Sequence, residues 1–395
     1  MIQYIDQVDI QNKRILLRVD FNVSLNADHT IANDERIRQA LPTIKMLMKN
    51  NNTLLLVSHL GQPKGYDAMF TTERLAVRLQ ELLNEGAKVT FVPFEKTFET
   101  AQYESGSTEP RIFMLDNIRF HKGEQKNDPD FARQLASLAE VYVSDAFGVC
   151  HRPDASVVGV PALLPHYGGL LLKKEVTMIS KIIRDPQKPV VAILGGAKIS
   201  TKISLIGKLM EVADYLLIGG GLANTFLCAM DVHIGKSVCE YPEVQTARRL
   251  LFDAAAKQTA VIVPKDAVVG TTPDSKESIV KKVSEILDTE SILDIGPETQ
   301  AEFGNYIAKA RTIVWNGPIG YVENPEYKRG TDFIYYAITQ NKDSVSVVGG
   351  GDTISAISKE EYLDQITHIS TGGGAMLEFI EKGTLPGIEA LTSST

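Results

Sequence analysis

The stretch Val347-Val348-Gly349-Gly350-Gly351-Asp352-Thr353-Ile354, within Ser346–Ser355, contains the unit from which this chain is built. An apolar β-branched run, typical of a buried strand, stops at three glycines, and a helix-like pattern follows a carboxylate and a hydroxyl. Glycine lets a backbone turn sharply and approach a ligand closely, and the N–H groups that open a helix attract anions. Because a carboxylate repels phosphate, Asp352 suggests an intervening cation and hence a metal–nucleotide site. The alternative is an N-cap after a glycine turn.

The same strand–turn–helix unit recurs along the chain. Apolar residues at three- and four-residue spacing predict helices over Ile37–Lys49, Thr72–Leu83 and Phe131–Leu138. Short apolar runs alternate with these segments, which predicts βαβ units and parallel sheets covered on both faces, an α/β fold. The expected strands are Arg14–Val19, Thr53–Val57, Lys88–Val92, Arg111–Leu115, Val141–Val143, Val190–Leu194, Tyr215–Ile218, Val261–Val263, Ile292–Leu293, Thr312–Trp315, Val345–Val348 and Ile366–Ser370.

A longer helical pattern over Tyr167–Arg184 interrupts this alternation. It is followed by Asp185-Pro186-Gln187-Lys188-Pro189, a proline-punctuated segment of the kind that links domains. A length of 395 residues favours two or three domains. Nearly every strand beyond this boundary ends in glycine. In open parallel sheets ligands bind at the carboxyl ends of the strands, so the glycines there mark a candidate site.

The composition is that of a soluble globular protein, with 44% apolar and 23% charged residues. The net charge of −8 argues against a nucleic-acid or anionic-membrane partner, and the acidic excess lies beyond residue 184. The start Met1–Asp6 has no features of a secretory signal. The longest uncharged stretch, Tyr215–Met230, is too short for a membrane span. Three cysteines, an odd number, argue against a disulfide framework. We therefore expect a cytoplasmic protein.

Two common phosphate-binding motifs are absent from the sequence. No GxGxxG motif follows a strand, because Gly219-Gly220-Gly221-Leu222 lacks the third glycine at the required offset. No Walker A motif is present, because Met230 occupies the first glycine position before Gly235-Lys236-Ser237. Neither a dinucleotide fingerprint nor P-loop ATPase chemistry is supported.

Other groups nevertheless suit phosphoryl transfer, which needs positive charge, a metal on the nucleotide and in-line placement. Lys198 and Lys202 lie four residues apart after Gly195-Gly196, which predicts that both project from one face at the start of a helix. Gly372-Gly373-Gly374, opening a helix over Ala375–Lys382, offers bare amides to a charged transition state. The alternatives are a solvated helix face and a tight turn.

The N-terminal half contains polar and basic side chains after several of its strand ends. Arginines that converge on one crevice would bind a small, multiply anionic molecule through bidentate contacts. Taken singly, the histidine could be a packed loop residue and the aspartate a cap, but their joint position at strand ends favours a site. The residues are Asp20, Asn22, Arg36, His59, Arg119 and Arg152.

Several short motifs, in order and spacing, link the whole chain to one family. They are Arg18–Val23, Ser58–Gly61, Asn117–Phe120, Asp145–Gly148 with His151-Arg152, Gly195–Lys198, Trp315–Pro318, Gly349–Thr353 and Thr371–Ala375. With these motifs the chain resembles the phosphoglycerate kinases over essentially its whole length. The resemblance implies two doubly wound, Rossmann-like parallel-sheet domains joined by a helix and hinge. The implied limits are 1–170 for the N-terminal domain, 171–188 for the helix and linker, 189–378 for the C-terminal domain, and 379–395 for a segment that returns to the N-terminal domain.

The same resemblance implies a glycolytic reaction. A phosphoryl group moves reversibly between ATP and the carboxylate of 3-phosphoglycerate, with Mg²⁺, in a monomer whose domains close by hinge bending. A carboxylate acceptor is already ionised at neutral pH, so no general base is needed. Binding of 3-phosphoglycerate is implied for Asp20, Phe21, Asn22, Arg36, His59, Leu60, Gly61, Gln62, Arg119 and Arg152. Nucleotide binding is implied for Gly196, Lys202, Gly220, Gly296, Asn316, Glu323, Gly350, Gly351, Asp352 and Thr353, with Asp352 on the metal. The transferring group is implied to be held by Arg36, Lys198, Lys202, Gly372 and Gly373.

One position departs from the family pattern. Gln62 stands where the family commonly has arginine, which predicts a weaker hold on the anionic substrate, offset by Lys64. Two other classes of function stay open. One is a different small-molecule carboxylate kinase or ligase on the same paired domains, and the other is a non-catalytic nucleotide-binding protein.

Overall fold

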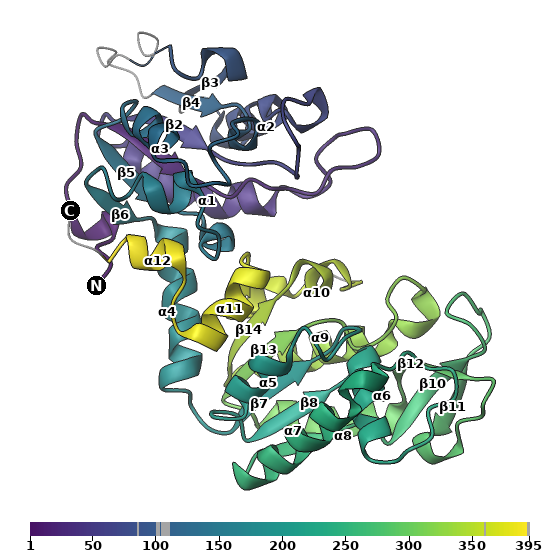
Figure 1. The fold of residues 1–395 in the computed structure, drawn as a ribbon. Coiled ribbons are helices and arrows are strands. Elements are labelled where there is room, and N and C mark those ends of the chain that lie inside the picture. The colour runs from purple at the N-terminus through teal and green to yellow at the C-terminus, as the bar shows by residue number, and fades with distance from the viewer. Residues whose placement is uncertain (85–86, 100–102, 104–110, 359–360, 393–395) are drawn as a thin grey trace. The chain divides into compact units, whose positions relative to one another are not determined.

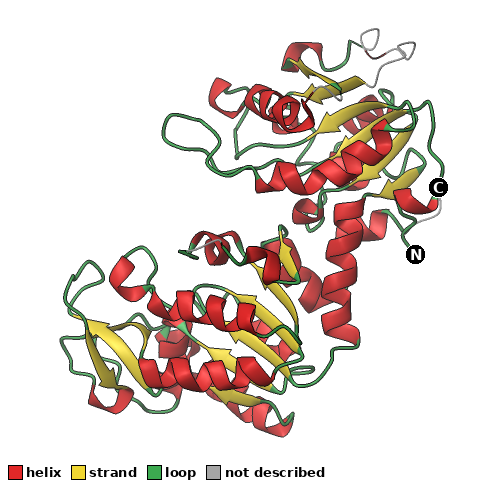
Figure 2. Cartoon of the chain, turned by 180° about the vertical axis from the view of Figure 1, so that it is seen from behind, coloured by secondary structure: helices red, strands yellow, loops and turns green. Residues whose placement is uncertain are grey.

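The computed structural model describes residues 1–84, 87–99, 103, 111–358 and 361–392. The chain forms two compact units (Figure 1). Unit 1 consists of Met1–Thr177 with Thr384–Thr395, and unit 2 of Met178–Gly383. Each unit is built on a six-stranded parallel sheet with helices packed alongside it (Figure 2). The predicted pair of parallel-sheet α/β domains is confirmed.

Unit 1 has the strand order β3-β4-β2-β1-β5-β6, with every neighbouring pair parallel. All five residues of β2 are buried, as expected for a strand covered on both faces. Helix α1 buries Ile37, Ala40, Ile44 and Leu47, the stripe that its sequence periodicity predicts. The strands are β1 (Arg14–Arg18), β2 (Thr53–Val57), β3 (Lys88–Val92), β4 (Arg111–Leu115), β5 (Val141–Ser144) and β6 (His166–Gly168). The helices are α1 (Glu35–Met48), α2 (Glu73–Leu83), α3 (Pro129–Ala136) and α12 (Pro386–Ala390), and α4 (Leu170–Arg184) contains the boundary between the units.

Unit 2 repeats the architecture with the order β15-β14-β13-β7-β8-β9, again parallel throughout. Its core gathers around Trp315, which is fully buried and donates its indole N–H to the Gly317 carbonyl at 2.9 Å. The strands are β7 (Val190–Leu194), β8 (Tyr215–Ile218), β9 (Ala260–Ile262), β13 (Thr312–Asn316), β14 (Val345–Gly349) and β15 (His368–Ser370). The helices are α5 (Ile203–Leu209), α6 (Gly220–Ala229), α7 (Val244–Ala256), α8 (Pro297–Lys309), α9 (Arg329–Gln340), α10 (Gly351–Ser355) and α11 (Gly374–Lys382).

One predicted strand belongs to a different sheet. Ile292–Leu293 lies in β12 (Ser291–Ile295), which pairs antiparallel with β10 (Asp266–Gly270). Strand β11 (Ile279–Lys282) completes this three-stranded sheet. The sequence pattern missed β10, β11 and the short strand β6, which includes Tyr167 from the expected long helix. Strand β6 has only three residues and β11 is mostly exposed, so both lack the continuous apolar run that marks the central strands. Strand β10 is fully buried, but its apolar run spans only residues 267–269.

The C-terminal segment packs within unit 1. The amide of Gly387, in α12, donates to the Cys150 carbonyl at 2.8 Å. A Cβ at Gly387 would lie 2.8 Å from Val157 Cγ1, so the helix approaches this surface closely only because the residue is glycine. Residues 393–395 of the expected returning segment lie outside the described residues.

A buried polar network lies inside unit 1. Arg18, Glu124 and Ser156 are each at most 1% exposed. Ser156 donates to both oxygens of Glu124, from its hydroxyl to Oε1 at 2.5 Å and from its amide to Oε2 at 2.9 Å. Arg18 Nε donates in turn to the Ser156 hydroxyl at 2.8 Å. Burial raises the pKa of the Glu124 carboxyl to about 7, against the opposing effect of the Arg18 charge.

The raised pKa predicts how the stability of unit 1 depends on pH. The folded state holds a proton on Glu124 that the unfolded state releases at its lower, ordinary pKa. This contribution to the unfolding free energy is therefore complete below about pH 4.5 and lost as pH rises through 7. In the parent protein, ionisation of Glu124 should lower the unfolding free energy by on the order of 3 kcal/mol as pH rises across this range. Glu124→Gln cannot ionise, so its unfolding free energy should lack this decrease.

Urea unfolding between pH 4.5 and 8, followed by far-UV circular dichroism, measures the effect, because the single tryptophan lies in unit 2. Asp130→Asn is the matched control, since the Asp130 side chain is 82% exposed. Parent and Glu124→Gln curves that run parallel across this range would contradict the assignment.

Candidate active site

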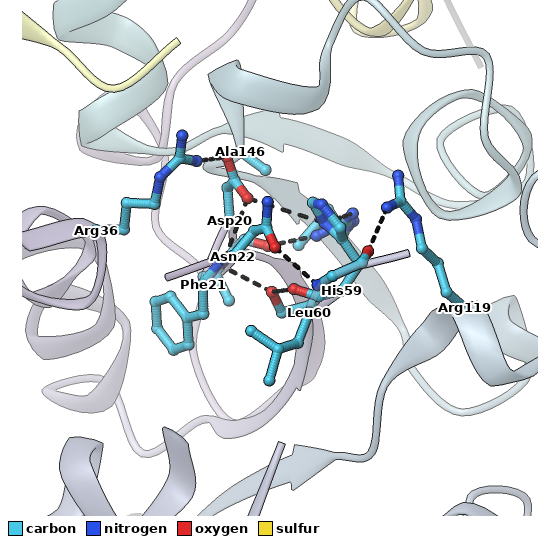
Figure 3. Close-up of polar contacts among 12 residues, drawn as sticks. Asp20, Phe21, Asn22, Arg36, His59, Leu60, Arg119 and Ala146 are labelled. Carbon is cyan, nitrogen blue, oxygen red and sulfur yellow. Dashed lines mark hydrogen bonds and ion pairs between the residues drawn. The ribbon is translucent and has the colours of Figure 1, made fainter. Parts of the chain in front are cut away.

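The polar groups of unit 1 gather at the carboxyl ends of adjacent parallel strands. Asp20–Asn22 follow β1, and His59–Gly61 follow β2. Arg119 lies in the 3₁₀ turn Ile118–Phe120 after β4, while Arg152 lies beyond β5. Because these strands are parallel neighbours, side chains far apart in the sequence meet at one edge of the sheet (Figure 3).

Asp20 is the centre of this group of side chains. It is 8% exposed, its Oδ2 forms an ion pair with Arg36 Nη1, and its Oδ1 lies 3.9 Å from His59 Nδ1. Burial alone would raise the pKa of Asp20, but the charges of Arg36 and Arg18 and the hydrogen bond from the Asn22 amide lower it below its ordinary value. The carboxylate is therefore ionised at neutral pH.

Asn22 joins the two strand ends. Its Oδ1 accepts the amide of Gly61 at 2.8 Å, and the preceding amide, of Phe21, donates to Ser58 Oγ at 2.9 Å. Arg119 reaches the same loop from the other side, donating from Nη1 to the Gly61 carbonyl at 2.6 Å (Figure 3). The loop backbone is thus fixed by side chains from two other strand ends.

Two arginines present buried nitrogen atoms that the protein leaves unsatisfied. Arg119 is 5% exposed, and its Nε and Nη2, like Arg152 Nε, have no hydrogen-bond partner within the described residues. Burial and then the charge of Arg152 lower the pKa of Arg119. Burial also lowers the pKa of His59 well below its usual value, and the three arginines Arg18, Arg119 and Arg152 lower it further. Buried donors without acceptors beside like charges form a site for an anion.

The structure therefore brings together most of the residues expected in unit 1, whereas the side chain of Gln62 faces solvent. Gln62 and Lys64 are exposed, so the predicted compensation between them stays a prediction. Three contributors were not assigned from sequence. Arg18 Nη2 lies 3.4 Å from His59 Nδ1, Ser58 holds Phe21, and Asn117 donates to the Leu60 carbonyl at 2.6 Å. Each of the three opens one of the family motifs, Arg18–Val23, Ser58–Gly61 and Asn117–Phe120, and that position was the available signal.

The second group of side chains lies at the strand ends of unit 2. Lys202 Nζ donates to Asn316 Oδ1, and Asn316 Nδ2 donates to the Gly349 carbonyl at 2.9 Å. Thr353 Oγ1 accepts the Gly317 amide at 2.8 Å and donates to the same Gly349 carbonyl at 3.0 Å. The ends of β13 and β14 are thus tied to the first turn of α10.

Lys202 is the basic group of this network. Burial lowers its pKa to about 8, against the opposing effect of the Asp352 charge. Asp352 itself is exposed at the start of α10. A lysine with a lowered pKa beside a lone exposed carboxylate is an arrangement more typical of a functional site than of a surface ion pair.

A cavity of about 240 Å³ opens beside these strand ends within unit 2. The expected residues Gly196, Gly220 and Glu323 line it, whereas Gly296 adjoins it through Ile295. Gly220 has φ +66°, and a Cβ there would lie 2.8 Å from the Gly196 carbonyl oxygen, so a side chain would force the two loops apart. The cavity also has apolar walls that sequence reasoning did not assign, from Ala223, Val238, Ile292, Ile319 and Tyr321.

Two expectations about local structure are wrong. Lys198 and Lys202 do not share a helix face, because α5 begins only at Ile203 and both lysines lie in the turns before it. Ser200, between them, donates from its amide and its hydroxyl to Glu240, and such side-chain bonds compete with the helix. The Gly372 amide is also not bare, since it donates to Ser370 Oγ at 3.1 Å. Gly373 and Gly374 do have open space where a Cβ would lie.

Two kinds of feature are absent from the described residues. Within the described residues, no three His, Cys, Asp or Glu side chains gather so that they could hold a metal ion. In the same part of the chain, no helix combines the length and apolar character needed to cross a bilayer.

Comparison with known proteins shows which family this chain resembles in sequence and fold. The model of the family described as phosphoglycerate kinase matches residues 5–383. The phosphoglycerate kinase of Dictyoglomus turgidum is 44% identical over 384 residues, covering 97% of this chain and 96% of that protein. The corresponding protein of Moorella thermoacetica is 44% identical, with 98% of each chain covered.

Solved structures agree with the sequence relatives. The structure of phosphoglycerate kinase from Coxiella burnetii has a TM-score of 0.89 at 37% identity and covers 99% of each chain. That from Pyrococcus horikoshii has a TM-score of 0.86 at 30% identity and covers 98% of each chain. With sequence and fold in agreement from end to end, this chain belongs to the phosphoglycerate kinase family and is a kinase, an enzyme that transfers a phosphoryl group.

Proposed function

We propose that the protein transfers a phosphoryl group reversibly between ATP and the carboxylate of 3-phosphoglycerate in glycolysis, giving ADP and 1,3-bisphosphoglycerate. The observation that carries this proposal is the set of buried, unpartnered nitrogen atoms on Arg119 and Arg152. A molecule with a phosphate and a carboxylate supplies the acceptors that these donors need. Its carboxylate oxygen attacks the γ-phosphorus of ATP, the bond to the β–γ bridging oxygen breaks, and ADP leaves.

In this proposal unit 1 binds the acceptor. Arg119, Arg152 and His59 hold the anionic groups, while Asp20 fixes Arg36 by the ion pair between them. The substrate carboxylate is ionised at neutral pH, which makes a general base unnecessary. His59 suits a neutral role, since burial and three arginines keep its pKa low. It then acts as a hydrogen-bonding group rather than as an acid or base.

Unit 2 binds the nucleotide in the same proposal. The apolar cavity beside Gly196 and Gly220 is suited to a base, and the glycine-rich strand ends admit phosphates close to the backbone. Lys202 supplies positive charge to the transferring group. Lys198 and the Gly373 amide are assigned the same role. The expected hinge closure, the monomeric state and the cytoplasmic location stay predictions.

The residues present would suit a magnesium ion held by one protein carboxylate together with the phosphates of the nucleotide. No cluster of three or more ligating side chains occurs among the described residues, so a dedicated protein cage is not available there. Mg²⁺ commonly takes one carboxylate, substrate phosphates and water, and the exposed Asp352 beside Lys202 suits that mode. Bound there, the ion would neutralise phosphate charge, while Lys202 and Asn316 orient the nucleotide.

The direct test is ATP consumption by the purified protein with 3-phosphoglycerate, coupled to reduction of the acyl phosphate that forms. Acetate and aspartate, tested as acceptors in parallel, distinguish the alternative of another carboxylate kinase. Turnover with one of these acids and none with 3-phosphoglycerate would overturn the proposal. Binding of ATP without any transfer would favour the non-catalytic alternative.

Arg119→Lys should raise the KM for 3-phosphoglycerate about 10- to 100-fold, because lysine keeps the charge but loses the planar set of donors. The KM for ATP should not change. Steady-state kinetics at fixed ionic strength measures both constants. Arg133→Lys is the control, since the Arg133 side chain is 61% exposed and pairs only locally with Asp130. An unchanged KM for 3-phosphoglycerate would remove Arg119 from the acceptor site.

Lys202 should produce a descending limb in the pH profile. Its pKa of about 8 means that the charge is present below pH 8 and lost above it, so kcat/KM for the nucleotide should fall as pH rises through 8. Lys202→Arg should lower the rate but eliminate this limb, because arginine stays charged. Lys208→Arg, at an exposed pair with Glu211, should retain it. Identical pH profiles for the parent and Lys202→Arg would refute the role of Lys202.

Asp352→Asn should raise the Mg²⁺ concentration needed for half-maximal activity about tenfold or more, because the amide is a weaker ligand than the carboxylate. The KM for 3-phosphoglycerate should remain the same. Titration with Mg²⁺ at fixed ATP, starting from protein treated with a chelator, measures the shift. Asp343→Asn, at a side chain 79% exposed in the same unit, is the control. An unaltered Mg²⁺ requirement would exclude Asp352 as a ligand.

A further inference from the structure

Two cysteines meet beside the nucleotide cavity of unit 2. Cys228 lies in the last turn of α6, and Cys239 lies 11 residues later in the irregular segment that leads to Tyr241–Glu243. Both are partly exposed free thiols. Their side chains are near enough for Cys239 to act on the pKa of the Cys228 thiol. The third cysteine, Cys150, is fully buried in unit 1.

The backbone holds the two cysteines at this position independently of their sulfur contact. The amide of Glu240, next to Cys239, donates to Thr225 Oγ1 at 3.2 Å. Thr225 and Cys228 are three residues apart on α6, so they lie on the same face of the helix. The segment that carries Cys239 is therefore fixed against the face that carries Cys228.

We propose that Cys228 and Cys239 form a reversible disulfide, a redox modification site next to Val238 in the wall of the nucleotide cavity. The oxidant is a small-molecule disulfide, RSSR. One cysteine thiolate attacks a sulfur of RSSR, forming a mixed disulfide and releasing RS⁻, and the second thiolate then attacks the cysteine sulfur of that bond and releases a second RS⁻. The two cysteines lose two electrons and two protons, and the small disulfide is reduced to two thiols.

The order of attack follows from the surroundings of the two thiols. Burial, and then the neighbouring Cys239 side chain, raise the pKa of the Cys228 thiol to about 11, which makes it a poor first nucleophile. Cys239 lies in an irregular segment, which can accommodate a bulky mixed disulfide more readily than the helix that carries Cys228, so Cys239 reacts first and Cys228 resolves the mixed disulfide. Cys150 takes no part, because burial raises the pKa of its thiol to about 12 and it lies in the other unit.

Oxidation changes the position of the residues on either side of Cys239. A disulfide brings two sulfur atoms to about 2.05 Å, much closer than two free thiols can approach each other. Helix α6 is held by its own hydrogen bonds, so the irregular segment takes up the movement. On one side of Cys239, Val238 lines the cavity. On the other, Glu240 accepts from the amide of Ser200 at 3.0 Å and from its hydroxyl at 2.6 Å.

This movement reaches the loop that carries the basic group of the nucleotide site. Ser200 is two residues before Lys202, so a shift of Glu240 acts on the turn that positions that lysine. The effect on nucleotide binding rests on the proposed function, whereas formation of the disulfide does not. Oxidation should raise the dissociation constant and the KM for the nucleotide about fivefold or more, and leave the KM for 3-phosphoglycerate unchanged.

The first experiment tests the bond itself. The full chain, reduced and then incubated with oxidised glutathione, should lose the mass of two hydrogen atoms, and proteolysis without reductant should yield a peptide linking Cys228 to Cys239. Cys239→Ser should abolish the linked peptide, while Cys150→Ala should retain it. A stable glutathione adduct on Cys239, or no reaction at either thiol, would overturn the proposal.

The second experiment tests the consequence. Calorimetry with ADP and steady-state kinetics compare the oxidised protein with the same sample after dithiothreitol, with Cys228→Ser as an oxidation-resistant control. Recovery of nucleotide affinity on reduction, in the parent only, supports the coupling. Equal affinity in both states, with the linked peptide present, overturns it. If the reduced protein binds ADP but transfers no phosphoryl group to 3-phosphoglycerate, the proposed function fails while the disulfide result stands.

Discussion

Repulsion among clustered cations is the constraint on which unit 1 depends. Arg18, Arg119 and Arg152 all lower the pKa of His59, and Arg152 also lowers that of Arg119. Carboxylates oppose only part of these effects, Asp20 at His59 and Asp154 at Arg119. Asp20 is paired with Arg36, and Glu124, with a pKa of about 7, carries only part of a charge at neutral pH. Buried charge without a partner is costly, so the surrounding sheet must hold these groups in place against their mutual repulsion. A multiply anionic ligand would neutralise these charges, which would make its binding here favourable.

Unit 2 reaches the same kind of site by a different route, through close backbone approach. A Cβ at Gly195 would lie 2.0 Å from the Pro318 carbonyl oxygen, and one at Gly220 would lie 2.9 Å from the Gly196 amide. The loops after β7, β8 and β13 therefore pack against one another at a spacing that excludes side chains. Lys202 supplies positive charge at this glycine-lined edge of the sheet, and its hydrogen bond to Asn316 orients its ammonium group. Unit 1 therefore holds several fixed positive charges, whereas unit 2 has mainly glycine-lined space into which a charged ligand would fit.

The central elements of both units could be predicted from sequence because their signals are local. Strands such as Thr53–Val57 and Val190–Leu194 are continuous apolar runs, and the structure has them with the same bounds. The antiparallel sheet was missed because β11 is mostly exposed and its neighbours are brought together by tertiary pairing. In the candidate site, residue types and strand-end positions identified most members. The contacts among them could not be predicted, since Arg18 meets Ser156 across 138 residues and no local window contains both.

The failed expectation for Lys198 and Lys202 shows the limit of local pattern most clearly. Their four-residue spacing fits a helix, yet Ser200 between them gives both of its donors to Glu240, 40 residues later. With its amide and hydroxyl committed there, the chain turns once more before α5 begins, and Lys202 takes the N-cap position. A lysine at a helix start is unfavourable for the helix, because its charge repels the positive end of the dipole. From that position its ammonium group reaches Asn316 at the end of β13. The sequence breaks a helix rule at the residue for which a role in phosphoryl transfer is proposed, and a loop contact far along the chain holds that residue in place.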